Sequence, residues 1–178
     1  MSDVMAPEPA QLADQGRSAF TAKKFEEAAE LFRQAAEGFA LSHNGLMTAE
    51  MKNNMSVALL QAGKPQQALE AVIETDRLFE HANDLKRQAM ALANQAAALE
   101  ALDRPDEAIE KYELSAELFQ QLNEGDMRAM VKKSMAEMQL RRGKVKSSAF
   151  KMMDMLEARQ RPSIFERILR FFLRLFMR

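Results

Sequence analysis

The feature of this 178-residue sequence that most limits its possible folds is a repeat with a period of forty residues. Small and large side chains recur in fixed columns along it. One small column is followed four positions later by a large one, and these are Ala28, Ala68, Ala108 and Ser148, then Phe32, Val72, Tyr112 and Met152. Earlier columns hold small Gly16, Ser56, Ala96 and Ala136, then mainly large Phe20, Leu60, Glu100 and Leu140. Stacked helix pairs require such alternation, because the ridges of one helix must fit the grooves of the next.

Composition and turn residues indicate that every repeat is a pair of helices. Only 6 glycines and 5 prolines occur, whereas strong helix formers such as Ala, Glu, Gln, Leu and Lys are abundant. Gly63 and Gly143 are expected to end first helices in a left-handed conformation, and Pro65 and Pro105 to open second helices. The sequence therefore predicts an all-α fold with helix pairs at 9–22 with 25–41, 46–62 with 65–81, 84–102 with 105–121, and 127–142 with 144–159.

The segments QGRSAFTAKKFEEAAELFRQAA, MSVALLQAGKPQQALEAVIETD and QAAALEALDRPDEAIEKYELSA resemble tetratricopeptide (TPR) repeats. The small residue before the turn, the Ala after it and the aromatic or large residue four positions on carry the resemblance. The usual TPR period is about 34 residues, so this chain is similar to the long-helix subgroup, over roughly 9–159. The fourth repeat departs from the pattern at Ser148 and Met152. The resemblance implies a right-handed TPR-like helical solenoid.

The resemblance also implies a concave groove lined by the first helix of each pair. Asparagine amides there can donate and accept hydrogen bonds at once, and so hold the backbone of a bound peptide. The matching positions make the candidate groove residues Arg17, Asn54, Val57, Gln61, Asn94 and Arg141. A polar residue that caps a contact between helices is an equally good interpretation of Asn54 and Asn94.

No residue pattern in the sequence favours catalysis. The chain has no cysteine and only two histidines, His43 and His81, neither of which has a partner at the spacing of metal ligands. Glycine-rich phosphate loops and nucleophile motifs are absent from the sequence. We therefore expect a protein that is not an enzyme and that needs no cofactor and no metal.

Charge divides the chain sharply. Residues 1–126 carry 11 Lys and Arg against 22 Asp and Glu, a net of −11, and residues 127–178 carry 14 against 4, a net of +10. After Pro162, Ser163 and Glu166 form a capping box before an apolar run whose side chains cover an arc of about 200° on a helix. The expected attachment residues of this basic amphipathic helix are Ile164, Phe165, Arg167, Ile168, Leu169, Arg170, Phe171, Phe172, Arg174, Leu175, Phe176 and Arg178.

Three roles for this C-terminal helix stay open: attachment to an anionic membrane surface or membrane complex, docking into a partner or a second copy, and a cap on the last repeat. Nucleic acid is a poor partner, because the arginines share their helix with phenylalanines. No stretch is long and apolar enough to span a membrane, and the N-terminus does not resemble a secretory signal.

The sequence predicts a flexible N-terminus at 1–8, a solenoid of four repeats at 9–159 and the amphipathic helix at 160–178. The predicted function is a non-enzymatic scaffold or adaptor that assembles protein complexes. It would be cytoplasmic and peripheral on the cytoplasmic side of a membrane. The alternative is a soluble, self-associating scaffold that forms homo-oligomers through its C-terminal helix.

Overall fold

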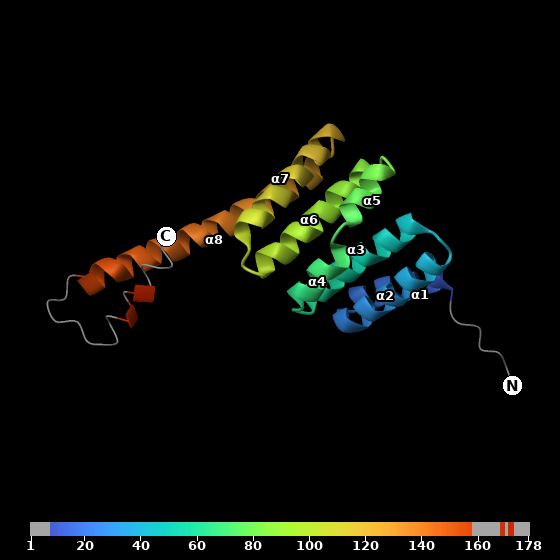
Figure 1. Cartoon of the computed structure of the whole chain (residues 1–178), viewed down its shortest axis with the longest axis horizontal. Coiled ribbons are helices and arrows are strands. Elements are labelled where there is room, and N and C mark those ends of the chain that lie inside the picture. Colours follow the sequence, from blue (N-terminus) through green and yellow to red (C-terminus); the bar gives the residue numbers. More distant parts are fainter. Residues whose placement is uncertain (1–7, 158–167, 170, 173–178) are drawn as a thin grey trace. The chain divides into compact units, whose positions relative to one another are not determined.

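The computed structural model describes the backbone of residues 8–157, 168–169 and 171–172, and the side chains of these residues apart from 145–157. By its contacts the chain divides into two compact units, Met1–Lys133 and Ser134–Arg178. The described part is all-α and contains no strand. Its helices are α1 (Pro9–Thr21), α2 (Phe25–Leu41), α3 (Gly45–Gln61), α4 (Pro65–Val72), α5 (Thr75–His81), α6 (Leu85–Ala101), α7 (Pro105–Gln121) and α8 (Gly125–Glu157) (Figure 1).

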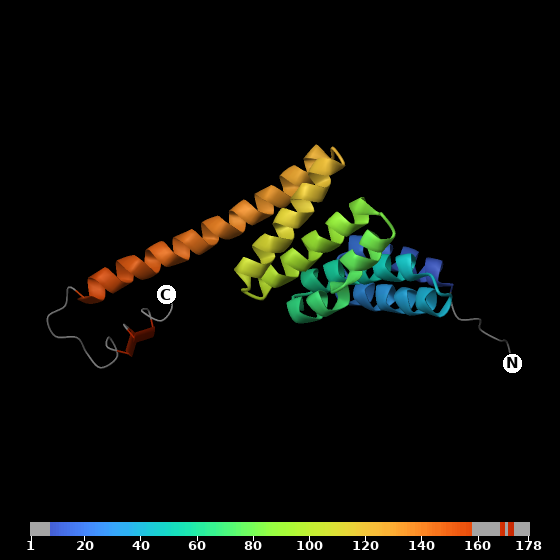
Figure 2. The ribbon, with the colours of Figure 1, turned by 45° about the horizontal axis from the view of Figure 1, so that its top comes forward.

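The forty-residue period is confirmed by the helix boundaries. The helices α2, α4 and α7 begin at Phe25, Pro65 and Pro105, and α3, α6 and α8 begin twenty residues after them. Consecutive helices of the first unit pack side by side, α1 on α2, α2 on α3, α3 on α4 and α6 on α7 (Figure 2). The first three predicted pairs are therefore present, and the first unit has a helical-repeat architecture.

Left-handed residues close the helices at the same spacing. They are Lys23, His43, Gly63, Asn83, Asp103 and Asn123, with φ between 54° and 74°. In each turn the next backbone N–H donates to the carbonyl five residues back, as Lys24 does to Ala19 at 2.9 Å. This hydrogen bond satisfies a carbonyl that the helix leaves free, and it turns the chain sharply. Of these six residues, only Gly63 was expected from the sequence to be left-handed, because the other five are not glycine.

Buried columns hold the pairs together. Ala28, Ala68 and Ala108 are fully buried, and Gly16 lies so close to Phe32 that an added Cβ would be 2.8 Å from the ring. Glu100 occupies the column of large apolar residues because its carboxylate accepts a hydrogen bond from the Tyr112 hydroxyl at 3.0 Å. The small column is thus where two helices approach most closely, as predicted.

The predicted continuous helix at 65–81 is interrupted in the structure. The α4 helix ends at Val72, and α5 starts at Thr75 after Glu74, whose φ is 64°. Glutamate favours helix, so local sequence gives no signal for this break. Tertiary hydrogen bonds to the Val72 carbonyl, described below, stabilise it.

The predicted fourth pair, 127–142 with 144–159, is wrong. One helix, α8, runs through Gly143 from Gly125 to Glu157, over 33 residues. A glycine inside a helix costs only about 1 kcal/mol relative to alanine. Pro65, two residues after Gly63, has no backbone N–H with which to continue the first helix. Val145 stands at the equivalent position after Gly143 and can donate this N–H. Gly143 is therefore accommodated within the helix.

We predict that Lys23→Gly stabilises the protein by about 1 kcal/mol, because glycine adopts a left-handed conformation without the steric cost of a Cβ. The φ of Lys23 is 59°. The matched control is Ala22→Gly at the neighbouring residue, whose φ is −77°, and which should lose up to about 1 kcal/mol. Urea denaturation measures both, and equal destabilisation by the two variants would contradict the assignment of a left-handed turn.

Candidate partner-binding face and attachment segment

Four of the expected groove residues lie on two neighbouring helices. Asn54, Val57 and Gln61 are on α3, where the first two are half-buried and Gln61 is exposed, and Asn94 on α6 is also half-buried. The two helices pack on each other, so the structure brings these positions together. Their spacing of three and four residues places the α3 members on one side of the helix. We call this surface of α3 and α6 the partner face.

The remaining two expected groove residues lie elsewhere. Arg17 is on α1 and forms an ion pair with Asp14 one turn earlier, with both side chains largely exposed. Arg141 is exposed on α8 and belongs to the second unit. Arg17 and Arg141 are therefore on other helices than the four residues of α3 and α6.

Sequence reasoning missed an ion pair that joins the two helices of the partner face. The Arg87 guanidinium on α6 lies 3.3 Å from the Glu50 carboxylate on α3, and 3.4 Å from Asp84. Met90, one turn before Asn94, is 42% exposed. The face therefore combines amides, a bridged charge pair and an exposed thioether, and such mixed surfaces can adapt to a peptide.

A buried amide network lies directly behind this face. Asn53, next to the predicted Asn54, is only 7% exposed, and its Oδ1 accepts from the Asn94 Nδ2 at 3.5 Å. The Thr75 hydroxyl lies 3.5 Å from the same oxygen. Asn94 is thus oriented by a buried partner. Asn53 could have been found because it shares a column with Ala13 and Ala93, where a polar residue is unexpected.

The same network supplies hydrogen-bond donors at the point where the helix is interrupted. Gln95, 4% exposed, donates to the Val72 carbonyl at 3.2 Å and to the Asp76 carboxylate at 2.7 Å. The Thr75 hydroxyl donates to the Val72 carbonyl at 2.8 Å. Buried carbonyls need such partners wherever the backbone ladder is broken. The break between α4 and α5 is therefore held by side chains of α6 and α5.

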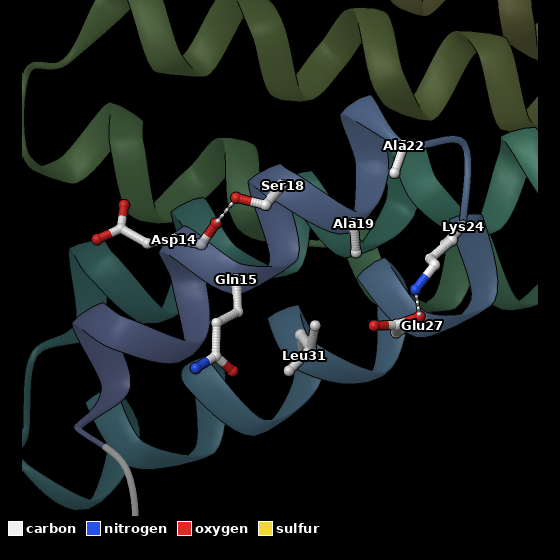
Figure 3. Close-up of a pocket in the computed structure, with 8 residues that line it drawn as sticks. All are labelled: Asp14, Gln15, Ser18, Ala19, Ala22, Lys24, Glu27 and Leu31. Carbon is white, nitrogen blue, oxygen red and sulfur yellow. Dashed lines mark hydrogen bonds and ion pairs between the residues drawn. The ribbon is translucent and has the colours of Figure 1, made fainter.

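A pocket of about 560 Å³ lies between α1 and α2, lined by Asp14, Gln15, Ser18, Ala19, Ala22, Lys24, Glu27 and Leu31. Figure 3 shows the Ser18 hydroxyl bonded to the Asp14 carbonyl and the Lys24 ammonium paired with Glu27. Gln15 and Ser18 correspond to positions that are covered in later repeats, where Gln95, Ala58 and Ala98 are buried. This pocket therefore lies on a side of α1 whose equivalent positions on α3 and α6 are covered by neighbouring helices.

The shifted pKa values belong to surface ion pairs. Hydrogen bonds from Arg33 and Gln34 lower the pKa of Glu30 to about 2, and Lys64 lowers the pKa of Glu26. Arg104 likewise lowers the pKa of Glu107. Each shift favours the charged carboxylate, as a structural ion pair does and a general acid does not. Among the described residues no cluster of side chains could hold a metal ion.

The described residues of the C-terminal segment present apolar side chains to solvent. Ile168, Phe171 and Phe172 are 51%, 66% and 59% exposed, and the two phenyl rings lie edge to face with centroids 5.7 Å apart. Leu169 is half-buried. The other expected attachment residues lie outside the described part of the chain: Ile164, Phe165, Arg167, Arg170, Arg174, Leu175, Phe176 and Arg178. Within the described residues, no helix is both long and apolar enough to cross a bilayer.

Neither a protein-family model nor a curated protein matches this chain. The function must therefore be inferred from the repeat, the partner face and the exposed C-terminal residues themselves.

We predict that Gln95→Leu destabilises the protein by about 1–3 kcal/mol, because it leaves the Val72 carbonyl and the Asp76 carboxylate without this donor. Leucine has a similar size, so lost packing contributes little. The control is Gln67→Leu on α4, where the side chain is exposed and the change should stay within about 0.5 kcal/mol. Guanidinium unfolding measures both variants, and a neutral Gln95→Leu would show that the break does not depend on this amide.

Proposed function

We propose that this chain is a TPR-like, right-handed solenoid that acts as a non-enzymatic scaffold. It binds protein partners through the partner face and is attached to an anionic membrane surface or a membrane complex through residues 163–178. The observation that carries the proposal is the forty-residue stacking of helix pairs, which keeps Asn54 and Asn94 in register on adjacent helices.

Extended peptides suit this face. An amide side chain can pair with both the N–H and the C=O of a peptide unit, so two amides in register hold the backbone of a peptide without reading its sequence. Asn94 is already positioned by its contact with buried Asn53, and a positioned donor loses less conformational entropy on binding. Met90 and Val57 supply apolar contact beside the amides.

Attachment to a membrane surface is supported by the described part of the C-terminal segment. Ile168, Phe171 and Phe172 expose more than half of their surface, which is costly in water and favourable at the boundary of headgroups and acyl chains. The chain beyond residue 126 carries a net charge of +10. Basic segments are attracted to the anionic lipids of the cytoplasmic leaflet, so we place the protein on the cytoplasmic side.

Co-sedimentation of the full chain with phosphatidylcholine vesicles containing phosphatidylserine tests the attachment. We expect pelleting that weakens with salt, and a loss of at least about tenfold in partitioning for Phe171→Glu/Phe172→Glu, because carboxylates replace two rings in the apolar layer. Leu41→Glu is the control, since Leu41 is 84% exposed but far from the segment in sequence. Equal pelleting of the wild type and the double variant would contradict membrane attachment and favour docking on a protein.

The partner face is tested by affinity capture with the full chain as bait. We expect Asn54→Ala/Asn94→Ala to lose proteins that the wild type retains, because the peptide backbone loses its amide contacts. Gln66→Ala/Gln67→Ala on exposed α4 positions should retain them, and thermal melts of both variants report their folding. Identical sets of captured proteins for folded variants would move the partner site away from this face.

A further inference from the structure

The first helix of each pair has one face that the second helix of the same pair covers. Gly16 on α1 contacts Phe32 on α2 in this way. The equivalent residues of α3 and α6, Ser56 and Ala96, are 1% and 0% exposed. Ala49 and Ala89, seven residues earlier on the same face, are both fully buried. This covered face is a constant property of the first three pairs.

In α8 the equivalent face is open. Ala129 and Ala136 occupy the positions of Ala49 and Ser56, and both are exposed. Leu140, at the position of half-buried Leu60, is 59% exposed. On another side of α8, Val131 and Met138 are 4% and 5% exposed, at positions where Ala91 and Ala98 are also buried. Within the described residues, α8 therefore resembles a first helix whose face is not covered by a second helix.

A segment suited to this face exists in the same sequence. Ser148 and Met152 keep the forty-residue spacing from Ala108 and Tyr112, so residues 144–157 carry the pattern of a second helix. They cannot cover the face of their own copy, because α8 is one helix from Gly125 to Glu157. Sixteen residues along a helix separate position 136 from position 152 by about 24 Å, whereas Gly16 and Phe32, equally far apart in sequence, touch.

We propose that two copies of the chain exchange these segments. Residues 144–157 of each copy lie on the face formed by Ala129, Ala136 and Leu140 of the other copy, and the two α8 helices run antiparallel. The exchange is reciprocal, so it closes as a twofold dimer with both open faces covered. A second copy is the occupant because its segment has a small residue followed four positions later by a large one. The second helices that cover this face in the first three repeats have the same spacing. The inference does not depend on the proposed scaffold function.

Light scattering of the full chain over a range of concentrations tests the dimer. We expect the wild type to have twice the chain mass and Leu140→Arg to have the mass of one chain, because a guanidinium would be buried without a partner. Met130→Arg is the control, since Met130 is 57% exposed at a position where Met90 is also exposed. A wild type with the mass of one chain at all concentrations, or a dimer that Leu140→Arg leaves intact, would overturn the proposal.

Cross-linking distinguishes exchange from a hairpin within one copy. The chain has no cysteine, so Ala136→Cys/Met152→Cys forms only the engineered disulfide, which needs Cα atoms within about 7 Å. Exchange predicts a covalent dimer on a non-reducing gel. Adding Val145→Pro recreates the Gly-Lys-Pro order of residues 63–65 and breaks α8, so the product should become a cross-linked single chain. A cross-link within one chain, without the proline, would overturn the exchange.

Discussion

Close contact between small residues of one helix and large residues of the next is the constraint on which the first unit depends. Ala28, Ala68 and Ala108 are fully buried, and Gly16 leaves no room for a Cβ beside Phe32. For these columns to meet in every repeat, helices must have a fixed length and turns a fixed shape. The helices α2, α3, α6 and α7 all have 17 residues. The left-handed turns between them return the chain in the same register each time.

Sequence periodicity was enough to predict the fold class and three helix pairs, because the positions where helices pack can be recognised from the sizes of the side chains. The prediction failed where a residue type is compatible with two backbone conformations. Gly143 looks like a helix terminator, yet without a following proline it stays inside α8. Conversely, Lys23 and Asp103 adopt left-handed conformations for which their residue types give little signal. The break at Glu74 was not predictable locally, since the amide that stabilises it, Gln95, comes 23 residues after Val72.

One hydrogen-bond network connects the partner face with the break between α4 and α5. Asn94 is half-buried on the candidate site, and its amide donates to Asn53, which lies beside the Thr75 hydroxyl at the start of α5. Asn54 and Asn94 were predicted from the resemblance, whereas the buried residues behind them were not. Buried polar groups are costly unless all are satisfied. The network therefore fixes how α3, α5 and α6 meet, and with them the orientation of the amide that a partner would contact.

The end of the repeat and the reversal of charge fall at the same place in the chain. The net charge of −11 on residues 1–126 gives way to +10 beyond them. The helix that crosses this boundary, α8, is the one in which Ala136 and Leu140 are exposed. An anionic surface that attracts the basic segment repels the acidic repeats. Two exchanged α8 helices would join two basic segments, and paired segments bind a surface more tightly than one because the second binds intramolecularly.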